Sequence, residues 1–445
     1  MTVLLNIQSY PSTQARLPLT IINCIQTYSD RKLTLLNQSQ PTMTLLKEAT
    51  DESIFDDETA KNQPQINYFS TDESIQQMSI LLSYTTNSSG NNNNNNNNNL
   101  LFPNVFTDSH DICNYIDTHF DTILFDCDGV LYRDSSHIIP HSISMLHYWI
   151  EIKKKTILFV TNNAGQSRQD LLLKLSKLFH LSPSTYFSIR HMITSGYSAA
   201  KYLSFLSITT HTPSHTIPHN INMYQYIHVI GEDALRTEFQ EMGFILVEHD
   251  DSTSSTSMTR DELASYPFHK VHRMDALVVG LDTRFNYRKL CIATGLLQRF
   301  PNALFIATNE DSYDVVGKDN YHLPGNGCII SALECASQRK AINVGKPTRI
   351  LVDLLIQEHS MNVHRTLMVG DRLDTDIQLG YEGGMTSALV FTGCTTADTL
   401  RDILEQATMN VEYRKWIPHM VLPHVGIMVP DSYSFKEEKE ENSSI

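Results

Sequence analysis

The sequence predicts an α/β fold built on a doubly wound parallel sheet, and two observations support this. Short apolar runs alternate along the chain with segments whose apolar residues recur at helical spacing, and several of the apolar runs end in polar residues. Alternating strands and helices are typical of a parallel sheet with helices on both faces. In such sheets ligands bind at the carboxyl ends of the strands, where these polar residues lie.

The elements can be placed by residue number. We expect strands at residues 122–125, 156–160, 275–281, 303–307, 366–370 and 387–391. Helical spacing is clearest at residues 167–179, 232–243, 286–300 and 347–360.

Composition indicates a globular protein. The chain has 445 residues, of which 41% are hydrophobic, enough for about two or three domains with sizeable cores. Lys and Arg total 34 against 49 Asp and Glu, a net charge of -15, and no basic stripe indicates a nucleic-acid partner. An acidic protein that handles an anionic substrate needs local positive charge, from a metal ion or from a few placed cations.

The cysteines and the apolar segments indicate the compartment. The seven cysteines are odd in number and scattered, without the CxxC or His-pair spacing of a zinc site. A disulfide framework is therefore not indicated, and we expect a reducing, cytoplasmic compartment. No apolar segment approaches the roughly 20 residues that a membrane helix needs, so we expect a soluble protein.

The two ends of the chain differ from the middle. Residues 1–105 are rich in Asn, Gln, Ser and Thr and include the homopolymer 91–99, so we predict a mostly disordered extension. The first residues carry Arg16 and no acid before Asp30, which is faintly similar to a mitochondrial transit peptide, but a single basic residue favours the plain extension. Residues 431–445 are charge-rich and are expected to form a second disordered tail.

Asp126 and Asp128 end the first apolar run, in the stretch TILFDCDGVLYR. Residues i and i+2 of an extended segment project to the same side, so both carboxylates can face one crevice while Cys127 points away. Two adjacent carboxylates can divide the chemistry, one as nucleophile or metal ligand and the other as general acid and base. A solvated turn is the alternative for this triplet alone; Gly129 and the apolar run before it favour a site.

Thr161, Asn162 and Asn163 follow the next apolar run, in FVTNNAGQSR, ahead of a helix expected to begin near Ser167. Their hydroxyl, amide and backbone N–H groups could hold phosphate oxygens. Helix capping uses the same residue types, and for this stretch taken alone capping is the favoured interpretation.

Lys346 and a group of aspartates lie at two further strand ends. Lys346, in VGKPTRILVDLL, is at a strand–helix junction where a cation could neutralise an anion, although a surface lysine is the usual alternative. In TLMVGDRLDTDI an apolar run ends at Gly370 and is followed by Asp371, Asp374 and Asp376. Carboxylates suit Mg²⁺, which commonly takes one or two of them together with substrate phosphate. Complementing a helix dipole is the alternative use of such a cluster.

In this order the four segments resemble the motifs of the haloacid dehalogenase-like hydrolase superfamily. DCDGVLYR, FVTNNAGQSR, VGKP and VGDRLDTDI are similar to the branch that contains 4-nitrophenylphosphatases, phosphoglycolate phosphatases and pyridoxal phosphate phosphatases. The similarity continues through ITSGYSAAKYL, VIGEDALRTEFQEMGF, VVGLDTRFNYRKL, IATNEDS and PGNGCIISALECA and spans about residues 110–425. The N-terminal extension has no counterpart in that pattern.

The resemblance implies a hydrolase of small phosphate monoesters that forms an aspartyl phosphate. By this resemblance Asp126 attacks phosphorus, and Asp128 first protonates the leaving oxygen and then activates water. Mg²⁺ would be held by Asp126, the backbone carbonyl of Asp128, and Asp371. The phosphoryl group would be bound by Thr161, Asn162, Asn163 and Lys346, with Asp376 supporting the metal ligands or Lys346 and Asp374 without a role. Phosphoryl transfer depends mainly on positioning and on neutralising charge, which a metal ion and a lysine supply.

The resemblance also implies a Rossmann-like core interrupted by an α/β cap. Because Lys346 must return to the crevice of Thr161, much of the chain between them has to fold apart from the core sheet. We place the cap at 204–324 and the discontinuous core at 106–203 and 325–430. A closing cap excludes water and lets remote contacts select the substrate. TTHTPSHTIPHN and EHDDSTSSTSMTRDELASYPFHK are polar loop insertions in or near the cap, and their histidines lack a metal spacing.

Arg284 bears on the choice of substrate, in the cap stretch GLDTRFNYRKL. Members of this branch often carry His at this position, on a loop that reaches toward the substrate. A permanently charged, forked side chain favours a second anionic group such as the carboxylate of phosphoglycolate, and a surface arginine is an equal alternative. Pyridoxal phosphate would be expected to use apolar or aromatic cap walls, and the sequence does not show which side chains line the site.

Other functions stay open at this point. A dehalogenase would not need Asp128, and an ion-pumping relative would need membrane helices. A phosphatase of proteins would be obstructed by a large cap, and a noncatalytic scaffold recruited through the Asn-rich extension would not need the four motifs together. We therefore expect an enzyme acting on a small phosphorylated metabolite, without a nucleic-acid or membrane partner. Only the resemblance implies a homodimer formed through the cap.

Overall fold

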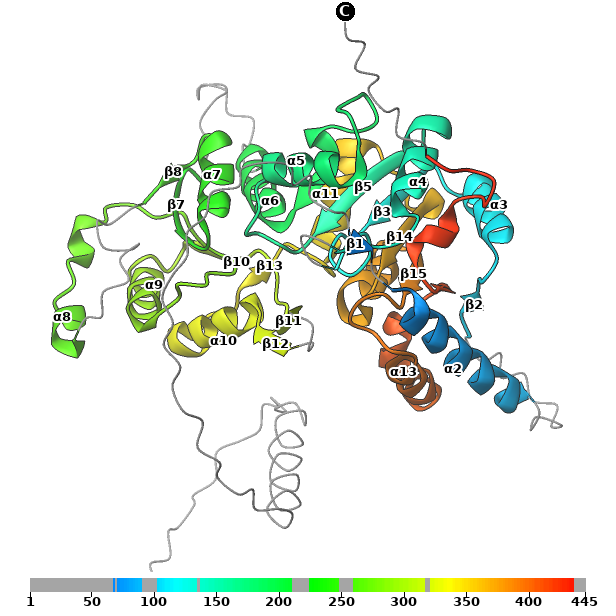
Figure 1. Cartoon of the computed structure of the whole chain (residues 1–445). Helices are drawn as coiled ribbons and strands as arrows, with labels where there is room; N and C mark the ends of the chain where they lie inside the picture. Colours follow the sequence, from blue (N-terminus) through cyan, green and yellow to red (C-terminus); the bar gives the residue numbers. More distant parts are fainter. Residues whose placement is uncertain are drawn as a thin grey trace, which may run out of the picture. The chain divides into compact units, whose positions relative to one another are not determined.

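Two parallel sheets organise the described part of the chain (Figure 1). A computed structural model describes residues 67–68, 70–89, 102–133, 137–209, 224–247, 259–316 and 321–435. All of these residues belong to one compact unit. No helix in the described ranges is long and apolar enough to cross a membrane. The proposed transit-peptide similarity falls outside the described residues.

The larger sheet has seven parallel strands in the order β2-β16-β15-β14-β3-β5-β6. They are β2 (Asn104–Val105), β3 (Thr122–Phe125), β5 (Thr156–Thr161), β6 (Met192–Thr194), β14 (Thr366–Gly370), β15 (Thr386–Val390) and β16 (Met420–Leu422). Every residue of β3 and β14 is buried, as expected for central strands covered on both faces. The predicted core strands are confirmed, with small shifts of their ends.

Helices cover both faces of this sheet, so the core is doubly wound as predicted. Ile123 and Phe125 of β3 pack in one cluster with α3 (Ser109–His119), α4 (Ser142–His147) and α5 (Arg168–Phe179). Leu124 points to the opposite face, where α11 (Arg349–His359) and α12 (Gln378–Gly383) pack. This alternation follows from the two-residue period of a strand.

A helix stands within the segment predicted to be disordered. α2 (Asp72–Ser89) packs Met78 and Leu81 against α13 (Ala397–Met409), and β2 adds an edge strand to the larger sheet. Ser74, Met78 and Leu81 are buried and recur at helical spacing, so this polar segment does carry an amphipathic pattern. The prediction of disorder is therefore wrong for α2 and β2, while the Asn homopolymer lies outside the described residues.

The chain also stays ordered beyond the predicted start of the C-terminal tail. Ser109 donates a hydrogen bond to Asp431 at 2.8 Å, and the Phe435 ring stacks on His147 with 3.7 Å between ring centroids. These contacts correct the predicted boundary at residue 431, because the apolar ring packs on the core. Residues after 435 lie outside the described part. A short pair of parallel strands, β1 (Asn67–Tyr68) and β4 (His137–Ile138), completes this half.

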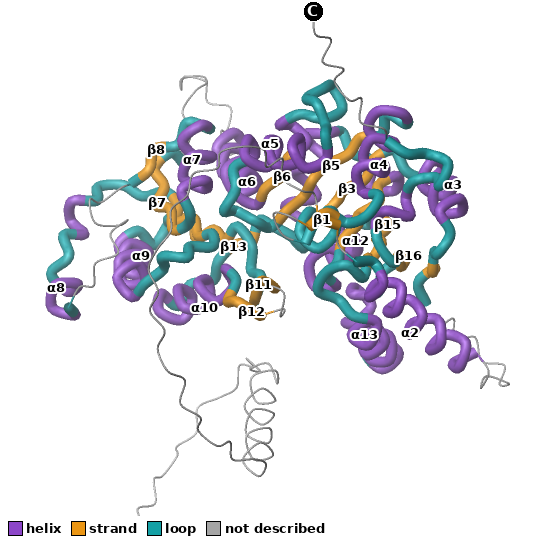
Figure 2. Tube along the Cα trace, viewed as in Figure 1, coloured by secondary structure: helices purple, strands orange, loops and turns teal. Residues whose placement is uncertain are grey.

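The second sheet has five parallel strands in the order β13-β10-β9-β7-β8, and its strands are coloured orange with those of the first sheet in Figure 2. They are β7 (Tyr226–Ile230), β8 (Ile245–Leu246), β9 (Ala276–Val279), β10 (Leu304–Ala307) and β13 (Ile342–Asn343). Helices α9 (Tyr287–Arg299) and α10 (Asn326–Ser337) pack on one face, and α6 (Ser195–Thr209) and α7 (Asp233–Glu241) pack on the other. α8 (Arg260–Ala264) and the antiparallel hairpin of β11 (Tyr313–Val316) and β12 (Tyr321–Pro324) complete this unit.

The second sheet and its helices form the cap, and they extend beyond the expected limits of 204–324. Ala199 and Leu203 of α6 pack on its sheet, as does Leu333 of α10. β13 pairs with β10, so the chain returns to the core only after Asn343. These apolar contacts correct both limits, which rested on the resemblance and on the separation of Thr161 from Lys346.

Candidate active site

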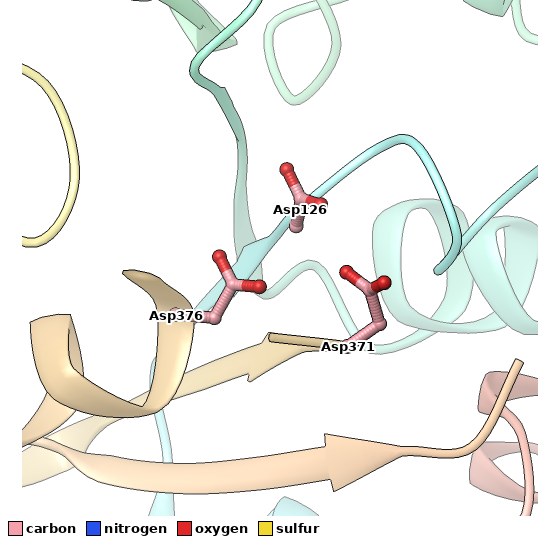
Figure 3. A group of neighbouring side chains, drawn as sticks. All are labelled: Asp126, Asp371 and Asp376. Carbon is pink, nitrogen blue, oxygen red and sulfur yellow. The ribbon is translucent and has the colours of Figure 1, made fainter. Parts of the chain in front are cut away.

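Three buried carboxylates meet at the carboxyl ends of two neighbouring core strands (Figure 3). β3 leads into Asp126, whose backbone N–H donates to the Val369 carbonyl of β14 at 2.9 Å. β14 leads into Asp371, and Asp376 follows on the short helical segment η5 (Leu373–Ile377). One oxygen from each of the three carboxylates lies within 4.8 Å of the others. Parallel pairing of β3 and β14 thus brings together residues that are far apart in the sequence.

Lys346 supplies the positive charge of this cluster. Its Nζ donates to Asp126 Oδ1 at 2.6 Å and to Asp376 Oδ1 at 2.7 Å, and its side chain is only 3% exposed. Burial alone would lower the pKa of Lys346, but the carboxylates of Asp126 and Asp376 outweigh it and raise that pKa. One ammonium group therefore faces three carboxylates, and the cluster has an excess of negative charge.

Burial, together with neighbouring charge, shifts the pKa values of two of these carboxyl groups. Burial raises the pKa of Asp126 well above its ordinary value, with Lys346 acting in the opposite direction. Burial and then Asp376 raise the pKa of Asp371 to about 6, against a hydrogen bond from the Cys394 backbone. A cation placed among these oxygens would lower both pKa values.

Glycines allow the chain to close around Asp371. Its Oδ2 accepts a hydrogen bond from Cys394 N at 2.6 Å, while its buried Oδ1 has no hydrogen-bond partner in the described part of the chain. A Cβ added at Gly393 would lie 1.9 Å from Oδ2, and one at Gly129 would lie 2.7 Å away. Gly129 also has φ of 82°, a left-handed conformation that favours glycine. The glycine that follows the DxD triplet therefore makes room for Asp371.

Asp128 lies outside the buried cluster, at its rim. Its side chain is exposed, and the turn that carries it is closed by a hydrogen bond from Gly129 N to the Tyr132 carbonyl at 2.8 Å. The protein walls around the open side chain still desolvate it, and this raises the pKa of Asp128, with Lys174 and Lys346 acting in the opposite direction. A raised pKa suits a carboxyl group that exchanges protons with a substrate.

The three polar residues after β5 have separate environments. Thr161 is buried, and its Oγ1 accepts a hydrogen bond from Asn163 N at 3.1 Å. Asn163 is exposed and accepts from Gly165 N at 2.8 Å, which shapes the loop before α5. The Asn162 side chain accepts from Lys346 N at 2.9 Å and donates to Lys346 O at 3.3 Å. The side-chain amide of Asn162 therefore binds the backbone of Lys346 and is not free for phosphate.

Capping, the alternative for this stretch, falls to Ser167. Its side chain accepts from Asp170 N at 3.1 Å, and Asp170 in turn accepts from the Ser167 backbone, so the pair forms a capping box at the start of α5. The residues at 161–163 therefore lie upstream of the helix cap.

Arg284 and Asp374 stand apart from the carboxylate cluster. The Arg284 guanidinium lies in the cap, is 54% exposed, and has ion-pair distances of 3.6 Å to Glu232 and 3.5 Å to Asp233. No described contact joins it to the buried carboxylates. Asp374 is exposed and pairs with Arg372 at 3.0 Å.

Sequence reasoning missed Asp311, which follows β10 of the cap. Its Oδ1 accepts a hydrogen bond from Asn162 Nδ2 at 2.9 Å. Burial raises the pKa of Asp311 to about 6, against the opposing effect of Arg372 and Lys346. The signal was available, because Asn309 and Asp311 follow an apolar strand in the same way as the other site residues.

Comparisons with known proteins identify the family of the chain. Residues 123–245 match the family model "Haloacid dehalogenase-like hydrolase", and residues 343–413 match the model "HAD-hyrolase-like". Phosphoglycolate phosphatase 2 of Arabidopsis thaliana is 34% identical over 63% of this chain and 86% of its own length. Human glycerol-3-phosphate phosphatase is 31% identical over 70% of this chain and 90% of its own.

A solved structure of similar fold is the 4-nitrophenylphosphatase of Thermotoga maritima, with 26% identity and a TM-score of 0.53 over 70% of this chain and 97% of that one. The chain therefore belongs to the haloacid dehalogenase-like hydrolases, as a phosphatase of that family.

Proposed function

We propose that the chain hydrolyses small phosphate monoesters with Mg²⁺ through an aspartyl-phosphate intermediate. The observation that carries this proposal is the buried cluster of Asp126, Asp371 and Asp376 with Lys346 at its centre. Phosphoryl transfer needs charge neutralisation and positioning, and the cluster supplies both at one sheet edge.

The donor set fits a hard divalent cation. Asp371 Oδ1 is buried without a partner among the described residues, and neighbouring carboxylate oxygens lie within 4.8 Å. Such oxygens suit Mg²⁺, which commonly binds one or two carboxylates and keeps positions for phosphate and water. Asp126, Asp371 and the backbone carbonyl of Asp128 would hold the ion, with Asp376 beside them. When bound, it would neutralise charge on the phosphoryl oxygens.

Asp126 is the proposed nucleophile. An oxygen of its carboxylate attacks phosphorus, and the bond between phosphorus and the leaving oxygen breaks. Lys346 Nζ, at 2.6 Å from Asp126 Oδ1, keeps this carboxylate oriented and adds positive charge beside the transferred group. The Thr161 hydroxyl, at the end of the adjacent strand β5, has a proton to donate to a phosphoryl oxygen.

Asp128 is the proposed acid and base. It gives its proton to the leaving oxygen as the first bond breaks, and the carboxylate that results takes a proton from water. The water oxygen then attacks phosphorus, the bond to Asp126 breaks, and inorganic phosphate leaves. The exposed position of Asp128 and its raised pKa support this exchange of protons.

Small esters are the favoured substrates. The relatives named above are phosphatases of phosphoglycolate and of glycerol 3-phosphate, and both are similar over most of their length. A cap that packs its own residues against the end of β5 restricts the space beside the cluster. We propose phosphoglycolate or glycerol 3-phosphate as the class, with Arg284 free to leave its weak surface pairs for a substrate carboxylate.

The test is phosphate release from 2-phosphoglycolate, glycerol 3-phosphate, pyridoxal 5′-phosphate and 4-nitrophenyl phosphate, with Mg²⁺ and with a chelator. Asp126→Asn should abolish release, and Asp374→Asn, which changes an exposed aspartate in a neighbouring segment, should leave it unchanged. Release that persists in Asp126→Asn, or that ignores the chelator, would contradict the proposal.

A further inference from the structure

Asp311 belongs to the cap by its place in the chain and contacts the core through its side chain. It follows β10, yet its Oδ1 accepts a hydrogen bond from Asn162 Nδ2 at 2.9 Å. Asn309, two residues earlier, donates to the Asn162 carbonyl at 2.7 Å. Asn309 and Asp311, which follow cap strand β10, therefore both bind Asn162 at the end of core strand β5.

Asn162 connects this contact to Lys346. Its Oδ1 accepts from Lys346 N at 2.9 Å, and its Nδ2 also donates to Lys346 O at 3.3 Å. A side-chain amide has one acceptor oxygen and two N–H donors, whereas an ionised carboxylate only accepts. Asp311 therefore holds the amide with Nδ2 toward itself and Oδ1 toward the Lys346 N–H.

The packing around this path leaves little room for movement. A Cβ added at Gly345 would lie 2.8 Å from Asn162 Oδ1 and 2.3 Å from the Thr308 carbonyl. Thr308 lies directly after β10, and Gly345 lies directly before Lys346. A displacement of the cap at this point would therefore move the backbone that carries Lys346.

We propose that Asp311 is a positioning residue that couples the cap to Lys346 through the Asn162 amide. This inference rests on the proposed phosphatase function, in which Lys346 lies beside the transferred phosphoryl group. Asp311 has no contact with the reacting atoms in this scheme. Its effect is to hold the ammonium group at its place beside Asp126, where it lies 2.6 Å from Oδ1.

Two substitutions at this position separate the hydrogen bond from the general packing. Asp311→Leu removes the acceptor, and Asp311→Asn keeps a carbonyl oxygen that can accept from Asn162. Asp353→Leu is the matched control, since Asp353 is an exposed aspartate on α11 that pairs with Arg349. The measurements are kcat and KM for 4-nitrophenyl phosphate, and calorimetric binding of inorganic phosphate to the Mg²⁺-loaded protein.

The expected result is a loss of about 10-fold to 100-fold in kcat for Asp311→Leu, because a shift of about 1 Å can cost this much. Phosphate binding should weaken in the same variant. The kcat and the phosphate affinity of Asp311→Asn and Asp353→Leu should stay within about threefold of the wild-type values. If Asp311→Leu does not fold, Asp311→Ala takes its place in the same comparison.

Two outcomes would overturn the inference. In one, the variant without an acceptor keeps its kcat and its phosphate affinity. In the other, Asp311→Asn loses as much kcat and phosphate affinity as Asp311→Leu, which would show that the charge of Asp311 matters rather than its hydrogen bond. A wild-type protein that releases no phosphate from any ester contradicts the proposed function instead, and phosphate binding by the Asp311 variants still decides the coupling to Lys346.

Discussion

Replacing Lys346 by Met should destabilise the metal-free protein and make it more dependent on Mg²⁺. The Lys346 side chain is 3% exposed and is bound to two carboxylates, at 2.6 Å and 2.7 Å. Removing one partner of a buried ion pair costs about 3–5 kcal/mol, and a cation shared by two carboxylates should lie toward the upper end. A divalent ion at about 100 times its Kd would return about 2.7 kcal/mol.

The assay is urea denaturation followed by circular dichroism, with Mg²⁺ or with a chelator at neutral pH. Lys289→Met is the matched control, because Lys289 is a second buried lysine, 2.5 Å from Asp282 in the cap. Both variants should lose stability in the chelator, but only Lys346→Met should gain more from Mg²⁺ than wild type gains. An equal gain from Mg²⁺ in all three proteins would refute the reasoning that this cluster is the metal site.

Three further predictions concern the carboxylate cluster and the cap. The folded pKa of Asp371 is raised from 3.8 to about 6, so in metal-free protein its stability contribution is full below pH 3.8 and lost as the pH rises through about 6. Asp371→Asn should make the Tm of the metal-free protein less dependent on pH between 3.8 and about 6. Gly393→Ala, whose Cβ would lie 1.9 Å from Asp371 Oδ2, should raise the half-saturating Mg²⁺ concentration about 10-fold. Gly243→Ala, which adds backbone strain at a φ of 84° but has nothing within 4 Å of its Cβ, should leave that concentration unchanged. Arg284→Met should raise KM for 2-phosphoglycolate about 10-fold and leave KM for glycerol 3-phosphate unchanged, since it removes a charged hydrogen-bond donor.

The central strands and the carboxylate cluster were predictable because their signals are local. β3 and β14 are apolar runs that end in Asp126 and Asp371, and the rule that parallel strands share one carboxyl edge brings these residues together. The resemblance implied that Lys346 binds the phosphoryl group, and in the structure its Nζ lies 2.6 Å from Asp126 Oδ1.

Other features depend on contacts that no local pattern contains. The amphipathic pattern of α2 is short and lies in a polar segment, and the helix buries Met78 and Leu81 only through its tertiary contact with α13. The C-terminal limit of the cap depends on β13, a two-residue strand that pairs with β10 although helix α10 separates the two in the sequence. Asn162 looked like a phosphate ligand because its residue type suits that role, but tertiary contacts direct its amide to Lys346 and Asp311. The homodimer expected from the resemblance stays a prediction.

The central claim is that Asp126 carries the phosphoryl group during turnover. Its most direct test is mass spectrometry of peptides after protein, Mg²⁺ and 4-nitrophenyl phosphate are mixed and quenched in acid. Asp128→Asn, which should slow the hydrolysis of the intermediate, serves as the variant in which it accumulates. Phosphate is expected on the peptide that contains Asp126, at that residue. Phosphate on another residue, or turnover by wild type with no phosphorylated peptide in either protein, would contradict it.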